Sequence, residues 1–356
     1  MTINHPQENC SKILLTGNLG YIGSVMVPLL KKLNYSVIGL DTNFYDSDCQ
    51  LYPVIAKPNF QVIKDIRDIE KENLSDIDAV IHLAALSNDP LGDLNPEITY
   101  EINYQATLRL SEMAKQCGVK RFVYASSQSM YGISKTDDEL DEDNSVKNPI
   151  TAYAKAKWMA ECELKKMGDD NFIISCFRPS TVFGSSPKLR CDIVYNNLIA
   201  CAYTTGKIEI RSDGSPFRPV VHVEDVSKAF ISGIRASKEL IANQSFNVGI
   251  PNGNFTVKEL ADAAGSVVKN STITFTNEHG SDARTYQVCF NKILTQLKDY
   301  FKPDWNLING GQELVSTFTT VGLTESDFRG EKTIRLMRLK NLISNNRLSP
   351  DLKWIK

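Results

Sequence analysis

The sequence predicts an α/β fold, in which a doubly wound parallel sheet is followed by a smaller, mixed α/β C-terminal lobe. The first observation is that short apolar runs alternate with helical patterns, as in a sheet built from β-α-β units. The second is that a glycine-rich turn separates the first apolar run from the first helical pattern. The third is that polar residues follow several apolar runs, where the carboxyl ends of parallel strands would bring them together.

The glycine-rich turn follows an expected first strand over 12–16 and precedes an expected helix over 24–33. We expect Gly17 to permit the sharp turn, Gly20 to let a pyrophosphate reach the backbone, and Gly23 to let the helix pack close to the strand. Free N–H groups at the helix start would then face the anion. A glycine triplet alone also fits a purely structural tight turn.

The second apolar run, over 35–40, ends at Asp41. An acidic residue about 20 residues beyond such glycines can accept hydrogen bonds from the ribose of an adenosine. It would also repel a 2′-phosphate, so Asp41 favours NAD over NADP as the cofactor. The alternative is that Asp41 caps a helix or a turn.

The later elements continue the alternation, and no Pro/Gly/Ser-rich linker separates the two halves of the chain. We therefore expect two lobes folded against each other with a cleft between them. An acidic, polar segment over 135–148 is expected to be a solvated loop. Further strands are expected over 60–65, 78–85, 121–126, 171–177 and 245–248, and helices over 96–117, 151–167, 192–204, 223–237 and 256–268.

Composition bears on the class of protein. Hydrophobic residues make up 42% and charged residues 23%, as in ordinary globular proteins. A net charge of -2 gives no electrostatic case for nucleic acid or an anionic membrane. No apolar run approaches the roughly 20 residues of a membrane span, and residues 1–11 lack the apolar segment of a signal peptide. The eight cysteines form no C-x-x-C pair, so we expect no metal site and reduced thiols in a cytoplasmic protein.

Three residues form a candidate proton-transfer set: Ser127, Tyr153 and Lys157. Tyr153 and Lys157 are four residues apart on an expected helix and share one face. A free tyrosine, with a pKa near 10, is a poor base, but a lysine ammonium and a bound nicotinamide cation would both favour the phenolate. The Ser127 hydroxyl would hold the substrate oxygen in line while a hydride moves to or from the nicotinamide. A lone Tyr-x-x-x-Lys pair is also common by chance.

Over about residues 12–300 the sequence resembles the extended short-chain dehydrogenase/reductase family, in its nucleotide-sugar epimerase/dehydratase branch. TGNLGYIG (16–23) matches T-G-x-x-G-[YF]-I-G, HLAA (82–85) matches H-L-A-A, SSQSMYG (126–132) matches S-S-x-x-V-Y-G, and the Tyr/Lys pair matches Y-x-x-x-K. The resemblance implies a Rossmann-type NAD-binding domain in which Ser127, Tyr153 and Lys157 are catalytic. It implies cofactor contacts from Gly17, Gly20, Tyr21, Ile22, Gly23, Asp41, Asp65, Ile66, Leu83, Ala84, Ala85, Asn103, Ser126, Tyr153 and Lys157.

The substrate-side motifs match this family less completely. The segment 178–184 resembles R-x-x-N-V-[YF]-G, but Thr181 replaces the usual Asn, and Pro219 replaces the Asp of a second motif. A guanidinium suits a diphosphate because it donates two parallel hydrogen bonds, although an internal salt bridge is the alternative for each arginine. Lys188 and Arg190 are either further phosphate contacts or solvated charges. The resemblance implies substrate contacts from Ser127, Thr181, Asn197, Leu198, Arg218 and Arg284.

The residues after Ser127 bear on the reaction. The resemblance implies that 4,6-dehydratases carry an Asp-Glu pair at the positions of Gln128 and Ser129, and that sugar-acid decarboxylases carry Glu at the latter. Neither Gln nor Ser titrates usefully, so both reactions are disfavoured. We expect NAD-dependent redox chemistry at C4 of a nucleotide-diphosphate sugar, with an epimerase as the main prediction. The alternatives are a net C4 dehydrogenase or ketoreductase, a 4,6-dehydratase, and a non-catalytic NAD-sensing protein.

The expected organisation includes a homodimer, because in the family the helices near 95–117 and 151–167 pair with their copies in a four-helix bundle. Their apolar residues could equally face the protein's own sheet. The basic, amphipathic segment 332–343 is expected either to contact another subunit or to pack on the protein's own surface. The expected parts are a flexible N-terminus (1–11), an NAD-binding domain (12–185, with parts of about 205–250 returning to it), a mainly substrate-binding lobe (186–323) and a helical extension (324–356).

Overall fold

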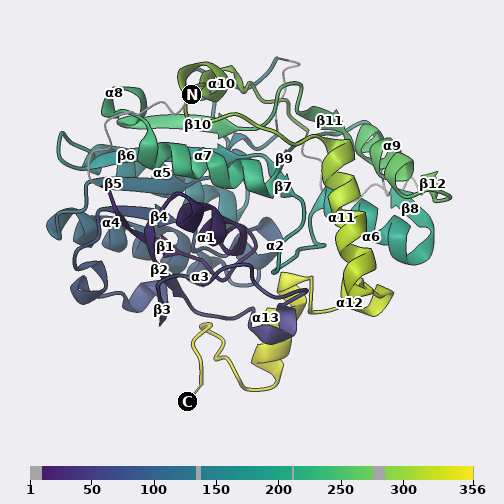
Figure 1. Cartoon of the computed structure of the whole chain (residues 1–356), viewed down its shortest axis with the longest axis horizontal. Coiled ribbons are helices and arrows are strands. Elements are labelled where there is room, and N and C mark those ends of the chain that lie inside the picture. Colours follow the sequence, from purple (N-terminus) through teal and green to yellow (C-terminus); the bar gives the residue numbers. More distant parts are fainter. Residues whose placement is uncertain (1–9, 134–137, 211, 276–284, 356) are drawn as a thin grey trace.

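The computed structural model describes residues 10–133, 138–210, 212–275 and 285–355. Its centre is a seven-stranded sheet in which every neighbouring pair is parallel, as the sequence predicts. The strand order is β10-β6-β5-β4-β1-β2-β3, with β10 at one edge and β3 at the other (Figure 1). The strands are β1 (Lys12–Thr16), β2 (Ser36–Asp41), β3 (Phe60–Ile63), β4 (Ala79–His82), β5 (Arg121–Ala125), β6 (Ile173–Pro179) and β10 (Gln244–Val248).

Apolar residues face both sides of this sheet, which accounts for the near-continuous hydrophobic runs of its strands. On β1, Ile13 and Leu15 pack in one buried cluster and Leu14 in another, because successive side chains point to opposite faces. The first cluster is covered by α1 (Gly23–Lys32) and α7 (Val223–Arg235). The opposite face is covered by α3 (Pro96–Tyr100), α4 (Ala106–Gln116) and α5 (Ala152–Met167).

The long helix expected over 96–117 contains a π-helical segment, Glu101–Gln105, between α3 and α4. Such segments re-aim the side chains around them and occur often at functional sites. Here Ile102, within the segment, lines the central cavity described below.

The smaller lobe gathers beside the carboxyl ends of the main sheet, with α11 and α6 upright in Figure 1. It has its own buried cluster, which includes Leu198 and Phe318. Its elements are the sheet β11-β9-β7 (β7 Thr181–Phe183, β9 Phe217–His222, β11 Asn254–Thr256), the pair β12-β8 (β8 Lys207–Ile210, β12 Thr272–Phe275), and the helices α6 (Val194–Thr205), α9 (Val257–Val267) and α11 (Leu307–Val321).

The C-terminal extension packs on the protein's own main domain. Leu339 and Leu342 of α13 (Arg335–Ser344) are fully buried in the same cluster as Leu14 of β1. Of the two arrangements expected for this amphipathic segment, its apolar face therefore takes the second, packing on the protein's own surface. The remaining short helices are α2 (Asp89–Gly92), α8 (Lys238–Ile241), α10 (Asn291–Gln296) and α12 (Glu325–Arg329).

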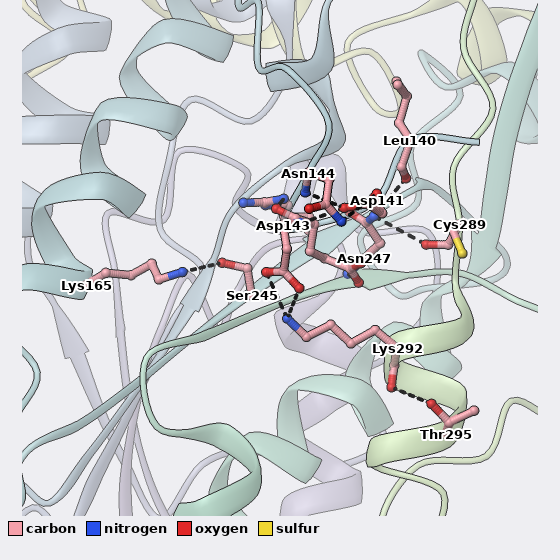
Figure 2. Close-up of polar contacts among 12 residues, drawn as sticks. Leu140, Asp141, Asp143, Asn144, Lys165, Ser245, Asn247, Cys289, Lys292 and Thr295 are labelled. Atoms are coloured by element: carbon pink, nitrogen blue, oxygen red, sulfur yellow. Dashed lines mark hydrogen bonds and ion pairs between the residues drawn. The ribbon is translucent and has the colours of Figure 1, made fainter. Parts of the chain in front are cut away.

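Over 138–148 the acidic segment after Gly132 is a mostly exposed loop, as its composition predicts, but it is also tied to the sheet. Within its described part, the buried Glu142 carboxylate accepts a hydrogen bond from the backbone N–H of Asn247 at 2.7 Å. The Asn247 amide donates to the carbonyls of Leu140 and Cys289, each at 3.3 Å, and Lys292 pairs with Asp143 (Figure 2). This segment is therefore anchored to β10.

No helix in the described ranges is both long enough and apolar enough to cross a membrane. The same ranges contain no group of three or more His, Cys, Asp or Glu side chains arranged to hold a metal ion. All eight cysteines are free thiols, four of them buried.

Candidate active site

A cavity of about 490 Å³ opens at the carboxyl ends of the sheet strands. It includes residues that follow β1 and β4, where the strand order reverses and where doubly wound sheets bind their ligands. The smaller lobe closes the other side. The lining includes Gly17, Gly20, Tyr21, Ile22, Gly23, Asp41, Asp65, Ile66, Leu83, Ala84, Ala85, Ser126, Ser127, Tyr153, Lys157, Thr181 and Arg218, all of which the sequence singled out.

The glycine-rich turn fits a phosphate cradle. Gly17 has a φ of +75°, and a Cβ there would lie 2.8 Å from the backbone nitrogen of Ala84. Only glycine combines this positive φ with so close an approach to another backbone without strain. A Cβ on Gly23 would collide with the backbone of Gly17 and Asn18, so this glycine lets α1 start close to the turn. The sequence-based prediction instead places this close contact against the strand. The turn thus leaves its backbone open toward the cavity.

Asp41 lines the cavity and also shapes the turn. Its carboxylate accepts the backbone N–H groups of Leu19 at 3.0 Å and Asn43 at 2.8 Å. Burial raises its pKa, although these hydrogen bonds oppose the rise. The ribose-binding and turn-capping interpretations are therefore compatible in this geometry.

Asp65 and Ile66, which the resemblance gives as contacts to the adenine of the cofactor, also line the cavity. Asp65 caps a short 3₁₀ turn and is bound by the Arg67 guanidinium, with an N–O distance of 2.8 Å. Burial opposes its ionisation, but the hydrogen bonds from Arg67 outweigh this and hold the pKa of Asp65 below its usual value. The strand expected over 60–65 ends at Ile63, because Asp65 begins that turn.

Asn103 supports the cavity wall instead of lining it. Its side-chain oxygen accepts from the backbone N–H of Leu86 at 2.9 Å, and its amide donates to the carbonyl of the same residue at 3.0 Å. Both polar ends of the fully buried side chain are therefore occupied. This geometry gives Asn103 an indirect role, not the direct cofactor contact predicted from the motif.

The structure brings Ser127, Tyr153 and Lys157 together. All three line the cavity, and burial raises the pKa of Tyr153 to about 12, although the nearby Ser127 side chain opposes the rise. The Lys157 ammonium donates to the carbonyl of Ala125 at 2.7 Å and lies 4.8 Å from the centre of the Tyr124 ring. Burial lowers the pKa of Lys157 to about 7.

These pKa directions differ from the sequence-based expectation that Lys157 favours the Tyr153 phenolate. Both groups are buried, and burial disfavours the charged form of each. The ammonium also faces a carbonyl rather than the phenol. Burial therefore outweighs the effect expected of Lys157, while the charge of Arg190 does lower the pKa of Tyr153.

A buried ion pair behind this set was missed in the sequence. Glu161, four residues after Lys157 on α5, pairs with Arg178 at 2.5 Å and accepts from Ser126 at 2.5 Å. Glu161 and Arg178 are 0% and 2% exposed. Its helical spacing from Lys157 places Glu161 on the same buried face, a signal that was available.

Two of the expected substrate contacts do not line the cavity. Asn197 is exposed and donates to the carbonyl of Cys191 at 2.9 Å, while Leu198 packs in the core of the smaller lobe. The motif marks α6 correctly but does not show which way its side chains point. Arg284 lies outside the described residues.

Lys188 and Arg190 are not the solvated charges that one interpretation expects, since both are buried. Arg190 lines the cavity and forms two hydrogen bonds with Asp192, at 2.8 and 3.0 Å. Lys188 donates to the carbonyl of Asp46 and is not a lining residue. The sequence also missed Arg335 of α13, which reaches the cavity from the C-terminal extension.

This fold and site define a dinucleotide-binding enzyme of the short-chain dehydrogenase/reductase type. The model of the NAD dependent epimerase/dehydratase family matches residues 13–249. The chain belongs to this family and is an NAD-dependent enzyme. Its glycine turn and Asp41 fit that cofactor.

Relatives of several activities resemble the chain. It is 32% identical over 237 residues to a putative UDP-glucose 4-epimerase of Methanocaldococcus jannaschii, covering 64% of this chain and 75% of the relative. It is 30% identical over 276 residues to the dTDP-D-glucose 4,6-dehydratase of Mus musculus, covering 75% of each. Among solved structures, MoeE5 in complex with UDP-glucuronic acid and NAD is 25% identical with a TM-score of 0.73, covering 88% of this chain and 100% of that one.

Proposed function

We propose that the protein is a nucleotide-sugar 4-epimerase, which oxidises C4 of the sugar and reduces it again on the other face. The observation that carries the proposal is the pair of buried hydroxyls of Ser127 and Tyr153 in one cavity, beside the neutral side chains of Gln128 and Ser129. These residues can move a proton at a hydroxyl but offer no carboxyl group for a second proton transfer at an adjacent carbon.

In this proposal Ser127 orients the sugar hydroxyl and Tyr153 accepts its proton as the C–H bond at C4 breaks. Bound NAD supplies the hydride acceptor. Lys157 donates to the Ala125 carbonyl and lines the same cavity, and in this proposal its ammonium also binds ribose hydroxyls of the cofactor. After the 4-keto sugar turns over in the cavity, Tyr153 returns the proton to the sugar oxygen.

The dehydratase relatives do not outweigh this pattern. The amide of Gln128 donates to the carbonyl of Arg178 at 3.0 Å, and Ser129 binds Ser127 at 3.1 Å. Neither side chain can take the acid or base role that dehydration between C5 and C6 needs. Relatives with 4-epimerase names include a UDP-glucuronate 4-epimerase at 27% identity and a UDP-glucose 4-epimerase at 29%.

The nucleotide-diphosphate sugar would lie against the smaller lobe, which we propose as the substrate-binding part of the chain. Thr181 and Arg218 contribute to the lining from this side, together with Arg190. A guanidinium matches the fork of phosphate oxygens. Of these two arginines, Arg218 is the one that the resemblance implies as a substrate contact, so we propose it for the diphosphate.

The test is a panel of UDP-, dTDP- and GDP-sugars, with absorbance at the NADH wavelength followed beside product analysis. An epimer formed without net NADH supports the proposal. Stoichiometric NADH would favour the net C4 dehydrogenase or ketoreductase instead, and a 4-keto-6-deoxy product a 4,6-dehydratase. Tyr153→Phe should remove turnover, whereas Tyr203→Phe, in the smaller lobe, should retain it. The absence of turnover across the panel would favour an NAD-sensing protein.

We also propose a cytoplasmic homodimer formed through α4 and α5. Met159 of α5 is 39% exposed and Tyr100, at the end of α3, is 37% exposed, so an apolar surface is available there. Ile102, in the π-helical segment between α3 and α4, is buried and lines the cavity, so it is not part of this surface. Light scattering of the wild-type protein and of Met159→Glu tests the dimer, since a charge in the bundle should produce monomers.

A further inference from the structure

The C-terminal helix α13 sends one cation into the cofactor cavity. Arg335, its first residue, is 2% exposed and lines the cavity. One guanidinium nitrogen, Nη2, donates to the carbonyl of Lys188 at 2.6 Å. The guanidinium carbon lies 4.2 Å from the centre of the Tyr45 ring. The other terminal nitrogen, Nη1, is buried without a hydrogen-bond partner.

Arg335 also lacks a close ion pair within the described residues, although the carboxylates of Asp192 and Asp41 are near enough to act on it or be acted on by it. One turn later on the same helix, Arg338 pairs with Asp46, Asp48 and Glu331. No carboxylate in the described part of the chain forms such a pair with Arg335. The nearby Asp192 is paired with Arg190, a second cation close to Arg335. Burying a charged group without satisfying its hydrogen bonds is costly, and buried charges in folded proteins are normally paired. The unpartnered Nη1, facing the cavity lining, therefore indicates a partner that the described residues do not supply.

The position of Arg335 indicates which part of a ligand it meets. The carbonyl that it binds belongs to Lys188, whose own N–H donates to the Ser186 hydroxyl at 3.2 Å. That hydroxyl in turn donates to the carbonyl of Tyr21, in the glycine-rich turn, at 2.8 Å. The Arg335 charge also acts on Asp41, at the ribose end of the cavity. Arg335 thus lies beside the segment that covers the phosphate cradle.

We propose that Arg335 binds the pyrophosphate of the NAD cofactor, so that α13 completes the cofactor site opposite the glycine-rich turn. The free Nη1 and the planar guanidinium suit two phosphate oxygens. The proposal rests on the NAD site of the family and is independent of which sugar the enzyme converts. It gives the C-terminal extension a function beyond covering the sheet.

The test compares Arg335→Gln with Arg338→Gln in the full chain after bound dinucleotide has been removed. Titration calorimetry with NAD, ADP-ribose and adenosine measures affinity, and thermal unfolding without ligand measures stability. For Arg335→Gln we expect NAD and ADP-ribose to bind roughly 10- to 100-fold more weakly, with adenosine binding unchanged. Its unliganded Tm should equal or exceed that of the wild type, because a buried charge without a close ion pair is removed. Arg335→Lys should recover part of the affinity.

Arg338→Gln provides the structural control, since it breaks three ion pairs that hold α13 in place. It should lower the unliganded Tm. Unchanged NAD affinity in Arg335→Gln would overturn the proposal. The proposal would also fail if Arg335→Gln lowered the Tm as much as Arg338→Gln and weakened adenosine binding too, because Arg335 would then act only in packing. A loss confined to nucleotide-sugar binding, or to NADP, would assign the guanidinium to another phosphate. Because binding is the readout, these outcomes are separate from the failure of epimerase activity.

Discussion

Lys157→Met should make the cofactor-free protein more stable at low pH while abolishing its activity. The Lys157 side chain is 3% exposed and has no carboxylate partner among the ion pairs of the described residues. Burial lowers its pKa from the ordinary 10.5 to about 7, so the folded protein holds a proton there only at a cost. Methionine has a similar length and carries no charge.

The size of the effect follows from this pKa. The difference between 10.5 and about 7 corresponds to about 5 kcal/mol between the protonated and neutral forms. The hydrogen bond to Ala125 and the contact with the Tyr124 ring are lost in the variant, so we expect a net gain of about 2 kcal/mol at pH 6. Between pH 7 and 10.5 the unfolded chain binds one more proton at this position than the folded chain does. Wild-type stability therefore rises with pH relative to the variant.

Urea unfolding of both proteins at pH 6, 8 and 10, without dinucleotide, measures this difference. The advantage of Lys157→Met should be largest at pH 6 and should shrink as the pH rises through this window. A stability difference between the two proteins that stays the same at all three pH values would refute the reasoning. So would an advantage of the variant over the wild type that is larger at pH 10 than at pH 6. Lys155→Met, at an exposed position on the same helix, serves as the control and should show no such pH dependence.

Two further predictions concern the supports of the site. Glu161→Gln leaves the Arg178 guanidinium buried without its anion and should lower the free energy of unfolding by about 3 kcal/mol, whereas Glu163→Gln, in an exposed pair, should change it by less than about 1 kcal/mol. Equal effects in urea unfolding would contradict this. Gly17→Ala should weaken NAD binding and lower stability more than Gly118→Ala does, because both glycines have positive φ but only Gly17 has backbone atoms within 4 Å of the added Cβ. Equal losses in the two alanine variants would show that strain alone matters.

The dinucleotide-binding half was predictable because its signals are local. The apolar run of β1, the three glycines and the acid that ends β2 lie within about 30 residues, the length of one β-α-β unit. The apolar run forms a strand, the glycines form the tight turn, and the acid lies at the carboxyl end of the next strand. The parallel sheet and the cavity at its carboxyl ends follow from them.

The rest of the site depends on contacts between residues far apart in the chain. Asn103 and Asn197 lie on elements that the motifs identify, but only the packed helices show where their amides point. Arg335 meets a carbonyl 147 residues away, so no spacing in the sequence connects it to the cavity. The pKa values of Tyr153 and Lys157 likewise depend on burial, which spacing does not predict.

Hydride return at C4 is tested most directly with the nucleotide sugar found in the substrate panel, labelled with deuterium at C4 and incubated with the enzyme in ordinary water. NMR of the product then follows the label. We predict that the epimer keeps its deuterium at C4 and that no solvent hydrogen enters at C5. Loss of the label to released NADH, or exchange at C5, would contradict an epimerase in which Ser127 and Tyr153 act on one hydroxyl.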